Sequence, residues 1–435
     1  MPSPPRNSLD SSPLPFEMIS EIFFHCLPNV RTVPDKSEAP LLLGRICKEW
    51  REIALTTPSL WTTFVVHWTH VSGTVHLASL WLSRARGYPL SIQIHDPEGS
   101  DTHTRRAFLK TICRYASQWR DVELSLPLDV LSHLRIEGPL PLLERLVIGS
   151  EASIPENGRE TTVFRDAPLL RELHLTLDIT GIAQPRTIAL PWERLTSFTG
   201  CLFTNEEWLY VLSHASSLVE CKFHHCIGGQ QDLDVLAPLP LLKRLTLEGN
   251  SYRKLTGVLH FLTLPALDFL ELREEKVSWE QDMESPLRTT LSFLTRSSCP
   301  LRELRLTAYN ISPELLSQCL RTIPALEILE IAQLTHEIFA VLRLLHASSN
   351  LLPRLQSFNT HPASGAPIPY DDLIAMLFSR SSAKNGGAVR LERFKFTFAV
   401  LHTPCPEASV LDRFKVLVGK GMEIHLGPPD ISWVN

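Results

Sequence analysis

The chain has 435 residues, of which 44% are hydrophobic and 20% charged, and its formal net charge is −5. These values are typical of a globular protein and argue against a collagen-like, disordered or membrane-spanning chain. Lysine and arginine are spread along the whole length without a basic patch, so the sequence predicts neither nucleic acid nor a membrane as a partner.

The N-terminal part begins with a segment of unusual composition. Residues 1–10 contain proline and serine without an apolar core, so we expect a disordered leader and no secretory signal. Residues 14–27 predict a helix with one apolar stripe. A segment rich in proline and charge follows at 28–40 and separates this helix from the next one.

A second helix is predicted around the stretch ICKEWREIA, from Ile46 onward. Ile46, Trp50, Ile53 and Ala54 lie at positions i, i+4, i+7 and i+8, which places them on one side of a helix. The helix should end at Thr57–Pro58, because a residue before proline disfavours the α conformation. The open question is whether this apolar side packs on the same chain or on another one.

A short phrase of the form apolar-x-x-apolar-x-apolar then recurs at the spacing of leucine-rich repeats. Its copies occupy residues 119–124, 143–148, 170–175, 195–200, 218–223, 242–247, 267–272, 301–306, 326–331, 355–360 and 391–396. The last four positions alternate, so a strand would bury the fourth and sixth residues and expose the third and fifth. Each unit needs a neighbour to cover its apolar face, which predicts stacked parallel strands.

Helix signals lie between these phrases. Thr204 and Glu207 have the spacing of a capping box, and Ser312–Pro313 precedes another apolar run. Further helices are expected at 284–294, 335–347 and 370–379, and residues 74–94 and 408–426 resemble atypical first and last units. The predicted fold is therefore α/β, with residues 64–435 forming a curved leucine-rich-repeat solenoid that has its parallel sheet inside and its helices outside.

The motifs within residues 11–63 together resemble an F-box. They are Leu-Pro-x-Glu at 14–17, Ile-x-x-Ile-Phe at 19–23, Cys-x-x-Trp-x-x-Ile-Ala at 47–54 and Pro-x-Leu-Trp at 58–61. The 28–40 segment is longer than the loop usual at this place in the family. The layout, a three-helix F-box followed by degenerate repeats, is similar to the expanded F-box families of mushroom-type fungi.

This resemblance implies a substrate receptor of an SCF-type ubiquitin ligase, in which the F-box binds a Skp-family adaptor and, through it, cullin and RING subunits. The positions that would face the adaptor are Leu14, Pro15, Ile19, Ile22, Leu42, Ile46, Cys47, Trp50 and Ile53. A module of fifty residues cannot bury so many large side chains by itself, which agrees with docking on a partner. Phe23, Leu60 and Trp61 are instead expected to join the module to the repeats.

An unknown protein client is expected to bind the strand face, where positions three and five project. The candidate client-binding residues are His174, Lys222, Phe269, Glu271, Arg305 and Ile328. Phe269 and Ile328 are apolar at positions that should be wet, which indicates either a client-binding patch or a strand frame that slips by one residue there.

No metal, cofactor or catalytic group is expected. Cys221, His224, His225 and Cys226 resemble a zinc cluster, but the repeat frame points Cys221 inward and assigns Cys226 to the Asn/Cys position of such repeats. It also sends the neighbouring His224 and His225 to opposite faces. The phrase at His336–Glu337 lacks the second histidine of a metalloprotease motif. Nine cysteines without regular pairing indicate reduced thiols and a cytoplasmic or nuclear protein.

The sequence thus predicts a non-enzymatic receptor that holds a client for ubiquitin transfer, acting through proximity and orientation. The alternatives are a leucine-rich-repeat interaction scaffold without ligase output, and a hydrolase or metalloenzyme built on residues 221–226.

Overall fold

The computed structural model describes residues 14–67, 74–95, 102–126, 130, 134–149, 161–176, 185–226, 238–274, 284–307, 312–334, 345, 351–362, 368–381, 389–398 and 405–434. The density of internal contacts divides the chain into two compact units, residues 1–195 and 196–435, here called unit 1 and unit 2. The leader expected at 1–10 and the helix expected at 335–347, apart from residue 345, lie outside the described residues.

Unit 1 begins with short helices, which are α1 (Phe16–His25), α2 (Leu43–Ile46), α3 (Lys48–Thr56) and the 3-10 helix η1 (Pro58–Trp61). The expected helix around Ile46 is wrong in one respect, because it is interrupted at Cys47. That residue is extended, with φ −151° and ψ 172°, and its sulfur accepts a hydrogen bond from the Trp50 amide at 3.4 Å as the N-cap of α3. The helix ends before Pro58 as expected, since Thr57 has ψ 99°.

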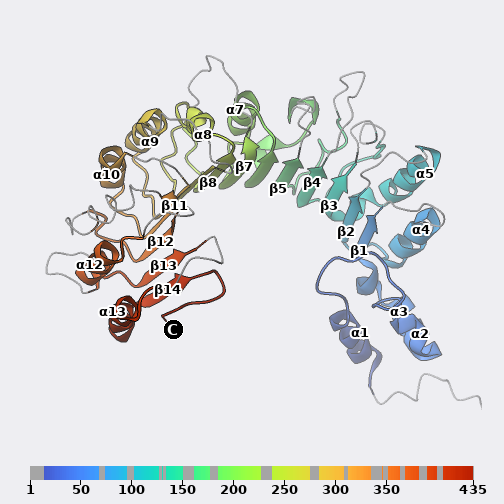
Figure 1. Ribbon diagram of the computed structural model, residues 1–435. Helices are drawn as coiled ribbons and strands as arrows, with labels where there is room; N and C mark the ends of the chain where they lie inside the picture. Colours follow the sequence, from blue (N-terminus) through green and yellow to red (C-terminus); the bar gives the residue numbers. More distant parts are fainter. Residues whose placement is uncertain are drawn as a thin grey trace, which may run out of the picture. The chain divides into compact units, whose positions relative to one another are not determined.

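The rest of unit 1 alternates strands with helices or loops (Figure 1). Its strands are β1 (Thr63–His67), β2 (Leu90–His95), β3 (Trp119–Ser125), β4 (Arg145–Gly149) and β5 (Glu172–Thr176). Its helices are α4 (Thr74–Arg84), α5 (Thr102–Cys113) and the 3-10 turns η2 (Ala116–Gln118), η3 (Pro185–Thr187) and η4 (Trp192–Arg194). Strand β1 was not predicted, because TFVVH is a continuous apolar run without the repeat phrase.

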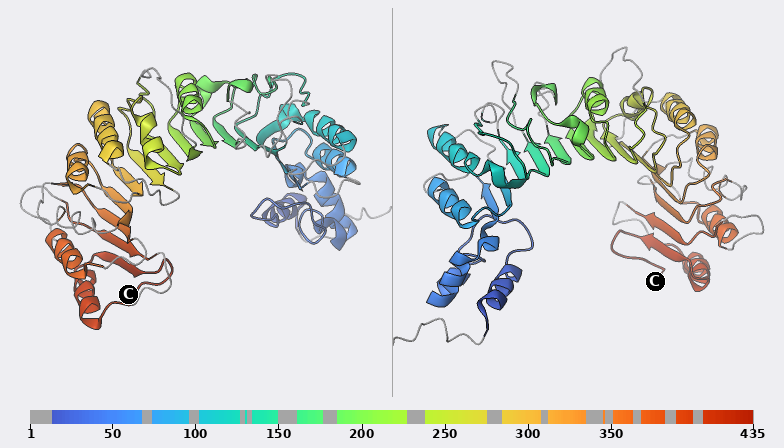
Figure 2. Two further views of the ribbon diagram at one scale, coloured as in Figure 1. Left: turned by 45° about the horizontal axis from the view of Figure 1, so that its top comes forward. Right: turned by 180° about the vertical axis from the view of Figure 1, so that it is seen from behind.

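Unit 2 continues the pattern with a helix after most strands. The strands are β6 (Ser197–Cys201), β7 (Glu220–Cys226), β8 (Arg244–Gly249), β9 (Phe269–Glu274), β10 (Glu303–Thr307), β11 (Ile328–Leu334), β12 (Ser357–Pro362), β13 (Arg393–Thr397) and β14 (Glu423–Gly427). The helices are α7 (Asn205–His214), α8 (Tyr252–Leu259), α9 (Glu284–Ser297), α10 (Pro313–Arg321), α12 (Tyr370–Arg380) and α13 (Ala408–Gly419). Within unit 2 these helices lie along one face of the strands (Figures 1 and 2).

The fourteen strands follow one another in sequence order in a parallel sheet, which is a repeat-like solenoid fold. Every predicted phrase carries a strand, which begins at the third residue of the phrase except in 119–124, where β3 begins at the first. Leu245 of β8, Leu270 of β9 and Leu304 of β10 are aligned by the strand register, and all three are buried. The fourth position of the phrase therefore stacks from one repeat on the next, as the alternation predicts.

Two predicted helix starts are confirmed by their caps. The Thr204 hydroxyl accepts from the Glu207 amide, and the Glu207 carboxylate accepts from the Thr204 amide at 2.7 Å, which completes a capping box. The Ser312 hydroxyl accepts from the Leu315 amide, with Pro313 in the first turn of α10. Among the described residues, no helix combines the length and the apolar character needed to cross a bilayer.

Candidate protein-interaction site

The N-terminal module, residues 14–61, has a small core of its own. The Phe23 and Trp50 rings lie 5.0 Å apart between α1 and α3, and the Trp61 indole N–H donates to the Ala54 carbonyl at 2.8 Å. Trp61 also packs against Trp81 of α4, with ring centroids 4.8 Å apart. The expected role of Trp61 as a joint to the repeats is thereby confirmed, whereas Phe23 packs within the module.

Apolar side chains gather on the outside of this module. Nine of the sixteen large hydrophobic side chains that are exposed in the described part of the chain lie between residues 14 and 46, namely Leu14, Phe16, Met18, Ile22, Phe24, Val30, Val33, Leu42 and Ile46. The repeats, in contrast, bury most of their large apolar side chains against neighbours. Exposed apolar residues concentrated in one small module make it a candidate interaction surface.

The positions predicted to face an adaptor divide into two groups. Leu14, Pro15, Ile22, Leu42, Ile46 and Cys47 are exposed, and Trp50 is half-buried against Phe23. Ile19 and Ile53 are buried within the module, so they support its core. The sequence analysis did not single out Phe16, Met18 and Phe24, which lie off the apolar stripe of α1 and are exposed. Their signal in the sequence is that a short helix carries apolar residues on a second side, where a helix that packs on one face would be polar.

The 28–40 segment is held against the first strands of unit 1. Arg31 forms an ion pair with Asp121 of β3, and Asp121 also accepts from Arg145 of β4 at 3.0 Å. Arg145 in turn donates to Glu172 of β5 at 3.1 Å. Burial by itself raises the pKa of Asp121, but the hydrogen bonds and charges of Arg31 and Arg145 outweigh it and hold that pKa below its usual value.

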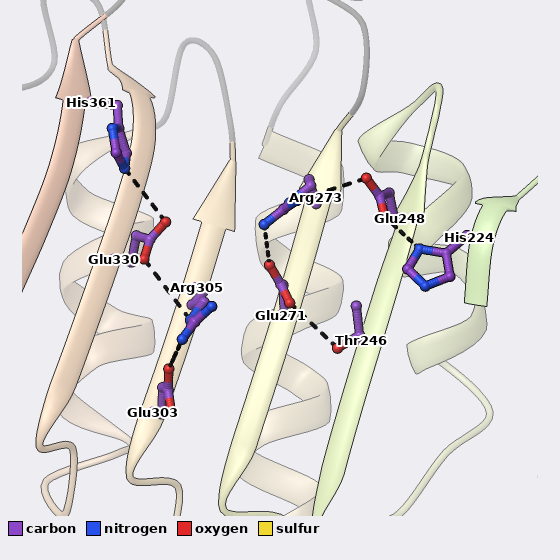
Figure 3. Close-up of polar contacts among 9 residues, drawn as sticks. All are labelled: His224, Thr246, Glu248, Glu271, Arg273, Glu303, Arg305, Glu330 and His361. Carbon is purple, nitrogen blue, oxygen red and sulfur yellow. Dashed lines mark hydrogen bonds and ion pairs between the residues drawn. The ribbon is translucent and has the colours of Figure 1, made fainter. Parts of the chain in front are cut away.

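The strand face of unit 2, opposite its helices, carries a network of charged side chains (Figure 3). On β7 to β9, His224 contacts Glu248 at 2.5 Å, Arg273 lies 4.0 Å from Glu248 and 2.7 Å from Glu271, and Thr246 donates to Glu271. The contact of Arg273 with Glu271 lies within β9, whereas the others cross between strands, because the register pairs Thr246 with Glu271 and Glu248 with Arg273.

A second group of charges continues the network on β10 to β12 (Figure 3). Arg305 forms ion pairs with Glu303 at 2.5 Å and with Glu330 at 3.9 Å, and His361 lies 3.6 Å from Glu330. The hydrogen bond with His361 and the nearby charge of Arg305 hold the pKa of the Glu330 carboxyl below its usual range despite burial.

The charges on this face are layered. The side chains of Glu220, Glu248, Glu271, Glu303 and Glu330 are between 12% and 31% exposed, whereas Lys222, Arg244, Arg273 and Arg305 are between 38% and 47% exposed. The carboxylates thus lie close to the strands and the long cationic side chains reach over them. The outermost charged groups of this network are therefore ammonium and guanidinium groups.

Phe269 illustrates this arrangement. Its ring is 4% exposed, because the Arg244 guanidinium lies 3.9 Å and the Arg305 guanidinium 5.4 Å from its centroid. Leu270 and Leu272 point into the core, so the strand frame does not slip at this phrase. Phe269 therefore supports two arginines and presents no apolar patch of its own, while Ile328 is half-buried.

The other predicted client-binding residues lie on the strand faces as expected. Lys222, Glu271 and Arg305 belong to the charge network of unit 2. His174 lies on β5 of unit 1, where it contacts Glu172 at 3.1 Å. In all four cases the side chain is engaged in ion pairs or hydrogen bonds within this chain.

The His/Cys stretch of β7 is part of the repeat. Cys221 is buried in the core as predicted, Cys226 is buried as well, and burial raises the pKa of the Cys221 thiol. His224 is engaged with Glu248, and His225 has a positive φ of 51°. In the described part of the chain, no three His, Cys, Asp or Glu side chains come together in a way that could hold a metal ion.

No known protein-family model matches this sequence, and no curated protein is significantly similar to it. Among solved structures, the fold is similar to that of a protein from Bacteroides fragilis, at 15% sequence identity and a TM-score of 0.35. The match covers 70% of this chain and 74% of the bacterial one.

Proposed function

We propose that this chain is the substrate-recognition subunit of an SCF-type ubiquitin ligase. In this role the N-terminal module binds a Skp-family adaptor, and the strand face of unit 2 binds a protein client. The chain would supply binding and orientation, while conjugation chemistry belongs to other subunits. The motifs that resemble an F-box, at 14–23, 47–54 and 58–61, indicate the adaptor.

The observation that carries this proposal is the exposed apolar surface of the module. Leu42, the N-cap of α2, and Ile46, its last residue, are 40% and 53% exposed. Burying each such side chain against a partner contributes about 1.5–3 kcal/mol, so an unpartnered surface of this kind is costly unless it is covered in a complex. The layered charges of unit 2 support the second half of the proposal, since they provide many polar contacts without a catalytic group.

The test is co-purification of the full chain with a Skp-family adaptor. The variant Leu42→Asp with Ile46→Asp should retain its circular dichroism spectrum and lose adaptor binding by about 100-fold or more, because two apolar contacts become buried charges. Trp50 is a poor target for this purpose, since it packs on Phe23 and its removal would disturb the module core.

A matched control uses two exposed apolar residues on other helices. Leu80 of α4 and Val416 of α13 are 40% and 52% exposed, so Leu80→Asp with Val416→Asp introduces the same charges at equally exposed places. The control should bind the adaptor as the parent does. If the parent chain binds no Skp-family adaptor, the ligase role is wrong and an interaction scaffold is left.

A further inference from the structure

Unit 1 contains a cavity beside α5 that the proposed function does not use. Its volume is about 790 Å³, within the range of small-molecule sites. Four cationic side chains line it, Arg106, Lys110 and Arg114 from α5 and its C-terminal end, and Arg135 from the segment before β4. Among the described residues of the lining, the acidic one is Glu137. The described wall thus carries four cations and one carboxylate, in a chain of net charge −5.

The three cations of α5 form a row along the cavity. Arg106 and Lys110 are four residues apart on one side of the helix, and Arg114 follows one residue after the helix ends at Cys113. The row is about 12 Å long at a rise of 1.5 Å per residue. A single phosphate ion cannot reach both ends of such a row, whereas a compound with several anionic groups can.

This row is unfavourable for the helix itself. Like charges at i and i+4 destabilise a helix, and no ion pair of Arg106, Lys110 or Arg114 with a carboxylate occurs among the described residues. The helix dipole favours cations near a C-terminus, which accounts for Lys110 and Arg114 taken alone. It accounts neither for Arg106 in the middle of the helix nor for Arg135 on another segment.

The floor between the cations is apolar. Leu109 and Cys113 line the cavity and are almost completely buried, and the backbone of Arg135 hydrogen-bonds to Cys113. Burial raises the pKa of the Cys113 thiol to about 11, so the thiol is neutral at physiological pH and does not offset the positive charge. The cavity thus combines a dry floor with a cationic rim.

We propose that this cavity binds a small compound that carries two or more phosphate groups. The length of the row requires separated anionic groups, and the volume sets the size of a metabolite. Guanidinium forks match phosphate oxygens in pairs, which favours phosphate as the anionic group. This site is independent of the adaptor surface and of the ligase role.

The test is isothermal titration calorimetry of the full chain with inorganic tripolyphosphate. Lys110→Glu should weaken binding by about tenfold or more, because it replaces a central cation with a repelling carboxylate. The same change places an acid four residues from both Arg106 and Arg114, so the melting temperature should stay the same or rise slightly. Loss of binding without loss of stability separates a binding role from a structural one.

Lys254→Glu is the matched control, because Lys254 is an exposed lysine on another helix, α8. It should bind tripolyphosphate as the parent does. The proposal is overturned if the parent binds no tripolyphosphate, if Lys110→Glu binds as tightly as the parent, or if Lys254→Glu loses as much affinity. Citrate bound as tightly as tripolyphosphate would also overturn it, because carboxylates would then suffice.

Discussion

Gly200 occupies the sixth position of its repeat phrase, where most strands carry an inward leucine, isoleucine or phenylalanine. The space is filled from outside the phrase by Phe203, whose ring is fully buried and lies 5.9 Å from Phe198 and 6.1 Å from Phe223. Leu202 has a φ of 65°, and this left-handed residue lies immediately before the buried ring. A neighbouring side chain thus replaces the missing one.

We predict that Gly200→Ala destabilises the chain by about 1–3 kcal/mol, because an added methyl group would overlap the Phe203 ring in a packed core. The matched change Gly419→Ala, at the end of α13, meets no atom within 4 Å and should be neutral or slightly stabilising. Thermal unfolding followed by circular dichroism compares the two variants. Equal melting temperatures would mean that the Phe203 ring does not fill the space beside Gly200.

At the scale of elements, the 28–40 segment connects the N-terminal module to the strands of unit 1. Its link is the ion pair of Arg31 with Asp121, which Arg145 shares. Because the pKa of Asp121 is lowered in the folded chain, its charged form stabilises the fold above the usual pKa of 3.8, and this contribution is lost as the pH falls below that value.

Asp121→Asn is therefore expected to lower the free energy of unfolding by about 1–2 kcal/mol at pH 7, since two charge-assisted hydrogen bonds are weakened. The difference between parent and variant should shrink as the pH falls below 3.8. Amide hydrogen exchange of residues 28–38 should speed up in the variant at pH 7.

Asp412→Asn provides the control for this experiment. Asp412 is 72% exposed and pairs with Lys415 on the surface of α13, so its loss should cost less than about 0.5 kcal/mol. A stability difference for Asp121→Asn that is constant from pH 3 to pH 7 would contradict a role for the Asp121 charge.

Elements formed by contacts between residues close in sequence could be predicted, whereas features that depend on contacts between distant residues could not. The strands of the repeat phrases and the capping box at Thr204 were predictable, because alternation and caps involve residues close in sequence. The break at Cys47 was not, since it rests on a weak sulfur cap inside an otherwise regular apolar pattern. The burial of Phe269 under Arg244 and Arg305 could not be predicted, because it depends on how β8, β9 and β10 are aligned. A single sequence does not give that alignment.

The candidate sites differ in the same way. The sequence motifs of the module singled out exposed Leu14, Ile22 and Ile46, but they did not single out Phe16, Met18 and Phe24. They also could not separate exposed Ile46 from buried Ile53. The cationic cavity was missed because charge was judged along the whole chain. The spacing of Arg106, Lys110 and Arg114 was visible in the sequence, but Arg135 joins them only in the folded unit.

At the scale of the whole molecule, the described repeats stack on their sequence neighbours within each unit. Leu270 of β9 is fully buried and aligned with Leu245 and Leu304 on the adjacent strands. In such a stack, stability is a sum of repeat and nearest-neighbour terms, so a defect should act locally before it acts on the entire chain.

Leu270→Ala is expected to cost about 2–5 kcal/mol and to increase hydrogen exchange first in β8 to β10. Leu241→Ala, at a site that is 50% exposed in the same unit, should change stability by less than about 0.5 kcal/mol and leave exchange unaltered. Hydrogen exchange followed by mass spectrometry measures the exchange rates of the strands in both variants. A uniform increase along all fourteen strands would contradict nearest-neighbour stacking.

The layering of charges on unit 2 affects how the strand face can tolerate substitution. Glutamates close to the strands hold the arginines and lysines in place, while the outer ends of those cations face solvent. Substitutions confined to these cations change the charge and shape of the exposed strand face and do not alter the buried leucines beneath it. The outward charged residues and the inward leucines of one strand therefore have separate roles. The outward residues can be substituted without loss of the packing that the leucines provide.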